Sequence, residues 1–361
     1  MSTPETFGAY LVYEKLGGGG MASVHRANRA DGEGPPIALK RLHPQLAQLD
    51  EFVQGFLDET RLAVRLQHDN IARTYDVGRV GDTYFIAMEL IRGPTLSQLM
   101  QHCWATKREI PLPIAMSIVM QLLDALEYAH RVTDERCQPL GIVHRDVTPS
   151  NVIVSNAGVA KLIDFGIAKA ASSNVRTKTG FIKGKFAYVA PEYIAGKIDS
   201  RVDLFAAGII AHELLAHRKL FQVDNDLETL KRVQSLAIER PSKWHPRVPA
   251  SIEDVVMVAL RRDPATRWQT AAEMRAALSH TVQRLPDARQ VGTWVNDTLG
   301  QAPPSDASAV SIEISLIEEH YTKIGAMLDG STERKATKRA LMLAILFVIA
   351  SAVIAYAIAT R

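Results

Sequence analysis

Residues 144–151 read His-Arg-Asp-Val-Thr-Pro-Ser-Asn, and Asp164-Phe165-Gly166 begins thirteen residues after Asn151. Two short apolar runs between these stretches predict a β-hairpin that holds them on neighbouring loops. An Asp beside an acceptor hydroxyl can take its proton, which is the role expected of Asp146. Asn151 and Asp164 supply the hard oxygen ligands that Mg²⁺ prefers. The order of these groups therefore predicts a magnesium–phosphate site.

A glycine-rich stretch lies upstream between two predicted strands, and it reads Leu16-Gly17-Gly18-Gly19-Gly20-Met21-Ala22-Ser23-Val24. Glycines let backbone N–H groups approach phosphate oxygens that a side chain would keep away. The stretch lacks the Gly-Lys-Ser/Thr ending of a Walker loop and opens no helix, so a dinucleotide-binding turn is disfavoured. Lys40 follows the apolar run Ile37-Ala38-Leu39, so a strand carries its ammonium toward the same phosphates. Glu59 on the following helix is its expected partner, with Asp58 as the alternative.

The predicted elements change along the chain. Residues 8–90 read mainly as short strands with one helix over 45–67, and residues 93–280 read mainly as helices. Two unlike lobes with a cleft between them are therefore expected, in the α+β class. Residues 281–339 are interrupted by Pro, Ser, Asp and Gly and read as a linker.

Taken together, these motifs resemble the eukaryotic-type protein kinase family, and in particular its bacterial Ser/Thr kinase branch, over residues 8–280. Ala190-Pro191-Glu192 completes the ordered set. The resemblance implies a small lobe with an antiparallel sheet and one helix, followed by a large helical lobe. It also implies ATP and Mg²⁺, with Mn²⁺ as the alternative metal, and transfer of the ATP γ-phosphate to Ser or Thr hydroxyls of protein substrates.

The resemblance gives each matching residue an expected role. Asp146 is the catalytic residue, Asn151 and Asp164 are metal ligands, and Lys40 is held by Glu59. Beyond the glycine-rich stretch with Val24, the adenine base would contact Ala38, Met88, Glu89, Leu90, Ile91 and Ile153. Structural roles are expected for Arg145, for Asp203 as a brace of the catalytic loop, and for Glu192 paired with Arg267.

Two positions depart from the family pattern. The family has Lys two residues after the catalytic Asp, where this chain has Thr148, and Thr after Gly184, where this chain has Lys185. In kinase structures these positions face each other, so one hypothesis is an exchange in which Lys185 supplies the ammonium and Thr148 the hydroxyl. The alternative is that Lys185 is solvated and turnover is lower.

The resemblance also predicts control by phosphorylation of the segment between Asp164 and Glu192. Thr177 and Thr179 are the expected sites of autophosphorylation, because they lie where bacterial members of the family are modified. A phosphate there could pair with Arg145 and order the segment.

Three other readings compete with an active Ser/Thr kinase. A pseudokinase scaffold is supported by Thr148 but opposed by the presence of Lys40, Asp146, Asn151 and Asp164. A kinase for small molecules would not need the Ala-Pro-Glu segment that docks peptides. Tyrosine specificity stays open, because Thr148 removes the usual Ser/Thr marker without supplying the tyrosine-kinase one.

Composition limits the partners and the location. A net charge of +3 over 361 residues, with two cysteines and no CxxC pair, favours neither a nucleic-acid binder nor a zinc or disulfide protein. Residues 340–359 carry no charge and match the length of a membrane-spanning helix. Four Lys and Arg residues at 334–339 precede them, so we expect a single-pass anchor in an inner or plasma membrane with the kinase domain in the cytoplasm. Pairing of anchored domains as homodimers is a further expectation.

Overall fold

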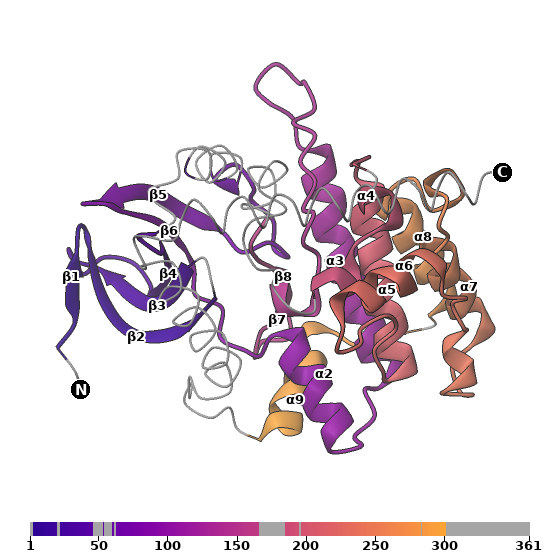
Figure 1. The fold of residues 1–361 in the computed structure, drawn as a ribbon. Helices are drawn as coiled ribbons and strands as arrows, with labels where there is room; N and C mark the ends of the chain where they lie inside the picture. The colour runs from indigo at the N-terminus through magenta and orange to yellow at the C-terminus, as the bar shows by residue number, and fades with distance from the viewer. Residues whose placement is uncertain are drawn as a thin grey trace, which may run out of the picture. The chain divides into compact units, whose positions relative to one another are not determined.

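The computed structural model describes residues 3–19, 22–45, 53, 60, 63–165, 185–194, 196–282 and 284–300. They form a strand-rich lobe followed by a helix-rich lobe (Figure 1), which confirms the predicted α+β class. The helix expected over 45–67 and the span expected over 340–359 lie mostly or wholly outside the described residues.

The first lobe is a six-stranded sheet in the order β1-β2-β3-β4-β6-β5, with antiparallel neighbours throughout. Val24 pairs with Lys40, and Ala38 pairs with Met88. Because paired and alternate residues share a face of a sheet, these four side chains lie together on one face. The other face carries the lobe's core, which includes Phe7, Tyr10, Val12, Ala27, Ile37, Leu39, Phe85 and Ala87. The strands are β1 Glu5–Phe7, β2 Tyr10–Gly18, β3 Ala22–Arg29, β4 Ile37–Leu42, β5 Thr74–Val80 and β6 Thr83–Glu89.

The second lobe packs helices around α5, whose residues from Val202 to Ala216 are all buried. Helix α3 packs against both α5 and α8. A small hairpin of β7 and β8 follows Asn151 and precedes Asp164, so it connects the catalytic stretch to the Asp-Phe-Gly stretch. The elements are α2 Leu96–Ala105, α3 Leu112–Arg131, η1 Pro149–Asn151, β7 Val152–Val154, β8 Ala160–Leu162, η3 Lys185–Tyr188, α4 Pro191–Ile194, α5 Arg201–Ala216, α6 Asp226–Ser235, η4 Pro241–Lys243, α7 Ala250–Ala259, η5 Pro264–Thr266, α8 Ala271–Thr281 and α9 Ala288–Leu299.

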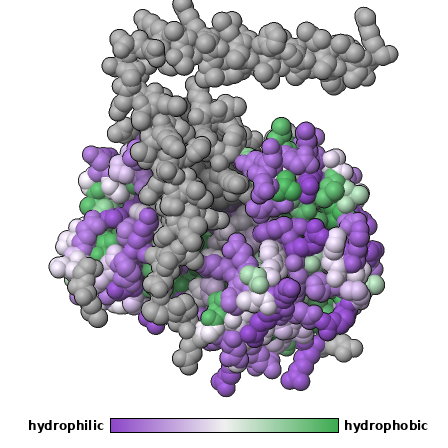
Figure 2. Space-filling model, turned by 60° about the horizontal axis from the view of Figure 1, so that its bottom comes forward, coloured by the Kyte–Doolittle hydropathy of each residue, from purple (hydrophilic) through white to green (hydrophobic). Residues whose placement is uncertain are grey.

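Within the described part of the chain, α3 is the one helix whose length and apolar composition match a membrane span. About two thirds of that window, 67%, is buried inside the lobe, as in the core helix of a folded domain. The exposed surface is mostly hydrophilic in the view of Figure 2, with apolar side chains in small scattered patches.

Helix α9 occupies part of the stretch predicted as a linker and lies beside α2 (Figure 1). Its contact with the β7–β8 turn depends on two glycines, Gly158 in the turn and Gly292 in the helix. A Cβ atom on Gly158 would lie 1.7 Å from the carbonyl oxygen of Ala288, closer than any real contact. Residues 288–299 are therefore a packed helix of the second lobe rather than a linker.

Candidate active site

Asp146 and Asn151 are joined directly at the centre of the catalytic stretch. The amide nitrogen of Asn151 donates to the Asp146 carboxylate at 2.9 Å and to the Asp146 carbonyl oxygen at 2.8 Å. Both residues are buried, at 8% and 7% exposure. The Asn151 carbonyl oxygen accepts from the Ile163 N–H at 2.9 Å, which ties the loop to the segment that carries Asp164. One carboxylate is thereby held in a fixed orientation.

Asp203, at the start of α5, holds the backbone of this stretch from below. Its carboxylate accepts from the N–H groups of His144 and Arg145 at 2.8 Å each, and contacts His130 Nε2 at 2.9 Å. Arg145 has a φ of 63°, a conformation that a non-glycine residue keeps only when its surroundings enforce it. Burial acts to raise the pKa of Asp203, but the hydrogen bond and charge of His130, with smaller contributions at His144, outweigh it and leave that pKa below its usual value. Asp203 is therefore an ionised brace.

His144 is a neutral structural residue. Burial lowers the pKa of its imidazole. Its Nδ1 accepts from the Asp146 N–H at 3.2 Å, so the proton is assigned to Nε2, which donates to the Ile163 carbonyl oxygen at 3.1 Å. The ring also packs against Phe165 with 4.6 Å between the ring centres. His144 therefore connects the catalytic loop to the Asp-Phe-Gly stretch.

Lys40 from the first lobe meets Asp164 from the second. Its ammonium lies 2.7 Å from the Asp164 carboxylate, with 18% and 31% of the two side chains exposed. Asp164 has a φ of 55°, so its carboxylate is presented from a constrained turn. Glu59, the expected partner of Lys40, and its neighbour Asp58 lie outside the described residues.

The donor set at this place fits a magnesium ion that is shared with phosphate. Asn151 uses its amide nitrogen toward Asp146, which leaves its side-chain oxygen as an acceptor. Asp164 adds a carboxylate. Among the described residues no three His, Cys, Asp or Glu side chains gather as a metal cluster. Mg²⁺ commonly takes one or two protein oxygens and completes its shell with phosphate and water, which matches this sparse set.

The glycine-rich stretch forms the hairpin between β2 and β3. The Gly19 N–H donates to the Ala22 carbonyl oxygen at 2.9 Å, and a Cβ atom on Gly18 would lie 2.9 Å from that same oxygen. Leu16 and Gly17 lie in the turn-proximal part of β2, which ends at Gly18, and Ser23 and Val24 follow Ala22, the first residue of β3. Gly20 and Met21 at the tip lie outside the described residues. The close approach of the two strands thus depends on glycine at position 18.

The segment after β6 connects the lobes where the adenine contacts are expected. Glu89 accepts from Lys161 of β8 at 3.0 Å and from the Arg73 N–H at 3.2 Å, so one carboxylate ties this segment to both lobes. Leu90 and Ile91 follow at intermediate exposure. Ile153 lies in β7, paired with Lys161. The tie between Glu89 and Lys161 carried no local sequence signal.

Thr148 lies against the end of the segment that contains Lys185. It is 5% exposed and borders a small cavity that Tyr188, Ala190 and Tyr193 also line. Its hydroxyl has no hydrogen-bond partner in the part of the chain that the structure describes. Lys185 opens η3, but its side chain lies outside the described residues, as do Thr177 and Thr179.

Glu192 and Arg267 form a buried fork. The two guanidinium nitrogens lie 2.5 and 2.7 Å from the two carboxylate oxygens, and the Arg267 side chain is 0% exposed. The guanidinium also lies 4.6 Å from the centre of the Phe205 ring. The resemblance paired these two residues, and the structure brings them together.

Comparison with known proteins agrees with this geometry. The model of the protein kinase domain family matches residues 10–282. The chain therefore belongs to the protein kinase domain family.

Two curated relatives and one solved structure illustrate the likeness. The tyrosine-protein kinase MasK of Myxococcus xanthus is 36% identical over 277 residues, which is 76% of this chain and 43% of MasK. The serine/threonine-protein kinase PrkC of Bacillus subtilis is 34% identical over 275 residues, covering 74% of this chain and 40% of PrkC. This chain thus spans less than half the length of these relatives. The crystal structure of the Mycobacterium tuberculosis PknI kinase domain matches with a TM-score of 0.60 and 29% identity, over 78% of this chain and all of that domain.

Proposed function

We propose that this chain transfers the γ-phosphate of ATP to serine or threonine hydroxyls of protein substrates. The observation that carries the proposal is the buried Asp146–Asn151 pair, tied through Ile163 to the Asp164 that meets Lys40. The Ser/Thr acceptor class follows the relative PrkC. MasK, whose name gives tyrosine as its acceptor, makes the acceptor class a question for experiment.

Each residue has a defined task in this reaction. Asp146 accepts the proton of the acceptor hydroxyl, and its orientation is set by Asn151. Lys40 supplies a cation that fixes the nucleotide phosphates. Bound Mg²⁺, held by Asn151 and Asp164, would neutralise charge on those phosphates. Asp146 thereby fixes the acceptor hydroxyl and Lys40 fixes the nucleotide, so the two reactants are held in position relative to each other.

The test uses the full-length chain in detergent micelles with γ-labelled ATP, Mg²⁺ and a generic protein acceptor. Label on serine or threonine that is lost in both Asp146→Asn and Lys40→Met supports the proposal. Label on tyrosine would correct the acceptor class. A folded chain that binds ATP but transfers no phosphate would favour the pseudokinase scaffold.

The Lys185–Thr148 exchange is part of this proposal. The buried Thr148 hydroxyl, which has no hydrogen-bond partner among the described residues, lies beside the segment that carries Lys185 and supports the exchange. Lys185→Ala should lower kcat by roughly 100-fold or more with little change in KM for ATP, because an ammonium on the transferring phosphate acts mainly in the transition state. Lys197→Ala, an exposed lysine of the second lobe, is the control. Equal turnover in the two variants would refute the exchange.

We also propose autophosphorylation at Thr177 and Thr179. The phosphate on either threonine would then form an ion pair with the Arg145 guanidinium. The constrained backbone of Arg145 beside Asp146 supports this, because a phosphate drawn to that arginine would act directly on the catalytic loop. Intact mass after ATP incubation should rise by one or two phosphates in the wild type and not in Thr177→Val/Thr179→Val. An equal rise in that variant would place the phosphates elsewhere.

The C-terminal anchor and the cytoplasmic location of the kinase domain are further proposals from the sequence of residues 334–359. Carbonate extraction of membranes should leave the full chain in the pellet. A Val348→Arg/Ala352→Arg variant should shift to the supernatant, because charges at the centre of a span are costly. Retention of that variant would contradict a span. Homodimers would appear as cross-linked pairs on the membrane, and chains that remain monomeric there would refute pairing.

A further inference from the structure

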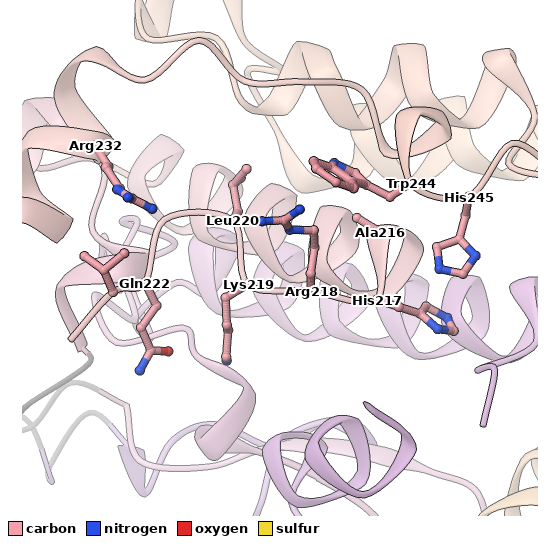
Figure 3. A pocket seen from close by; sticks show the side chains of 10 residues that line it. Ala216, His217, Arg218, Lys219, Leu220, Gln222, Arg232, Trp244 and His245 are labelled. Carbon is pink, nitrogen blue, oxygen red and sulfur yellow. The ribbon is translucent and has the colours of Figure 1, made fainter. Parts of the chain in front are cut away.

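A basic cavity of about 570 Å³ opens in the second lobe, away from the catalytic stretch. It lies between the end of α5, helix α6 and the loop before α7 (Figure 3). Its lining, all of it within the described residues, contains no acidic side chain. The residues that give it its character are His217, Arg218, Lys219, Arg232, Trp244 and His245.

Arg218 is the cation best placed to receive a ligand. Its guanidinium carbon lies 3.8 Å from the centre of the Trp244 ring, and Figure 3 shows the two side chains together. No carboxylate among the described residues pairs with Arg218. A guanidinium stacked on an indole keeps its N–H edge available and is already oriented, which favours planar anions such as carboxylate and phosphate.

The other cations of the cavity are differently committed. Arg232 forms a loose intrahelical ion pair, at 3.5 Å, with Glu228, and no other carboxylate among the described residues pairs with it. The rings of His217 and His245 lie 4.4 Å apart at their centres, so two imidazoles share one wall. Lys219 is already engaged, because it pairs with the buried Glu213 at 3.4 Å. The cavity therefore has a net positive field with Arg218 at its least satisfied point.

The side chain of Tyr188 connects the basic cavity to the active site. Lys219 donates to the Tyr188 hydroxyl at 2.8 Å, and that hydroxyl donates to Glu213 at 2.7 Å. Tyr188 in turn borders the small cavity that Asp146 and Thr148 line. Tyr188 therefore lies between Asp146 and the basic cavity. A polypeptide substrate with its acceptor hydroxyl at Asp146 would pass Tyr188 and could reach the basic cavity with a neighbouring side chain.

We propose that this cavity binds an anionic side chain of the protein substrate, a carboxylate or a phosphate a few residues from the acceptor. The proposal rests on the proposed function and names a substrate class for it. A protein partner is favoured over a lipid surface because the cations line a recess beside Tyr188. Trp244, which is 41% exposed, adds an apolar wall for the substrate chain.

The test compares acceptor peptides with neutral flanks against a series in which one aspartate, or one phosphoserine, moves along the sequence. With the full-length chain in micelles, an anion at one position should raise kcat/KM about fivefold over the neutral peptide, the scale of a partly exposed charge pair. Arg218→Glu should abolish that gain and transfer it to a peptide with lysine at the same position. Arg289→Glu on α9 reverses an exposed charge elsewhere and should retain the wild-type preference. Whether aspartate or phosphoserine gives the larger gain identifies the source of the anion.

A second readout separates this proposal from the kinase activity itself. Fluorescence anisotropy of labelled peptides on Asp146→Asn measures binding without transfer, and acidic peptides should bind more tightly than neutral ones. If acidic peptides bind more tightly than neutral ones but the wild type transfers no phosphate, the kinase proposal is refuted and the proposed anion site in the cavity is supported. Equal kcat/KM and equal Kd across the peptide series would overturn the proposal that the cavity binds an anionic side chain. So would equal losses in Arg218→Glu and Arg289→Glu, or an Arg218→Glu effect seen only with phosphatidylserine vesicles.

Discussion

Replacing Arg267 with alanine should destabilise the second lobe more than any exposed charge deletion. The Arg267 side chain is fully buried and donates two hydrogen bonds to Glu192, at 2.5 and 2.7 Å. It also donates to the carbonyl oxygens of Arg261 and Arg262. Arg267→Ala leaves a carboxylate without its partner and removes one donor from each of these two carbonyl oxygens.

The magnitude follows from what stays behind. Removing one member of a buried ion pair costs about 3–5 kcal/mol, because the other charge remains uncompensated. Glu192 keeps 12% exposure of its side chain, so water can reach it in part. The lower part of the range, about 3–4 kcal/mol, is therefore expected. At about 2 °C per kcal/mol for a domain of this size, the melting temperature should fall by roughly 6–8 °C.

Thermal unfolding of the full-length chain, followed by circular dichroism, measures this shift. Arg131→Ala is the matched control, since Arg131 pairs with Glu127 at 2.7 Å but is 72% exposed. An exposed pair of this kind is worth about 0–1 kcal/mol, so the control should move by at most about 2 °C. Glu192→Gln completes a double-mutant cycle with Arg267→Ala.

Two results would refute the reasoning. One is a melting shift for Arg267→Ala no larger than that of Arg131→Ala. The other is strict additivity of the Glu192→Gln and Arg267→Ala effects, because two groups that share hydrogen bonds must show an interaction energy. Either result would mean that the ion pair and its shared hydrogen bonds do not contribute the expected stability.

Three further predictions concern other parts of the second lobe. Gly158→Ala should lower the melting temperature by several degrees more than Gly141→Ala. Both glycines have a positive φ, but of the two only Gly158 lies against α9, so equal shifts would contradict that contact. Tyr188→Phe should destabilise by about 1–3 kcal/mol in chemical denaturation, because it removes a donor from a buried carboxylate; no change would contradict this. Burial, and next the charge of His245, lower the pKa of His217 in the folded chain. The neutral His217 ring therefore contributes its full stability above about pH 6.5, the pKa in the unfolded chain, and this contribution is lost as the pH falls through the lower pKa of the folded chain. His217→Asn, which tolerates the φ of 51°, should melt with a weaker pH dependence between pH 7.5 and 5.5, and an unchanged slope would refute the assignment.

The sequence predicted the parts of the site whose residues are close along the chain. Asp146 and Asn151 are five residues apart, so their contact follows from one turn of η1. The common face of Val24, Ala38 and Lys40 depends on the register between β3 and β4, which was seen only in the structure. The linker prediction over 281–339 was less successful, because composition hid a helix that begins with a capping box of Asp287 and Gln290. That signal was present in the sequence and could have located α9.

Polar contacts between distant segments are harder to predict, because burial decides which charged groups must pair. Arg218 and Lys219 are adjacent cations with no difference in local pattern. Of the two, Lys219 is the one that pairs with the buried Glu213; burial raises the pKa of that carboxyl, and the charge of Lys219 opposes this by stabilising the ionised form. Arg218 then faces the cavity with Trp244 as its support and without a carboxylate among the described residues. One of two neighbouring cations is structural and the other is available for a ligand, and only the tertiary structure distinguishes them.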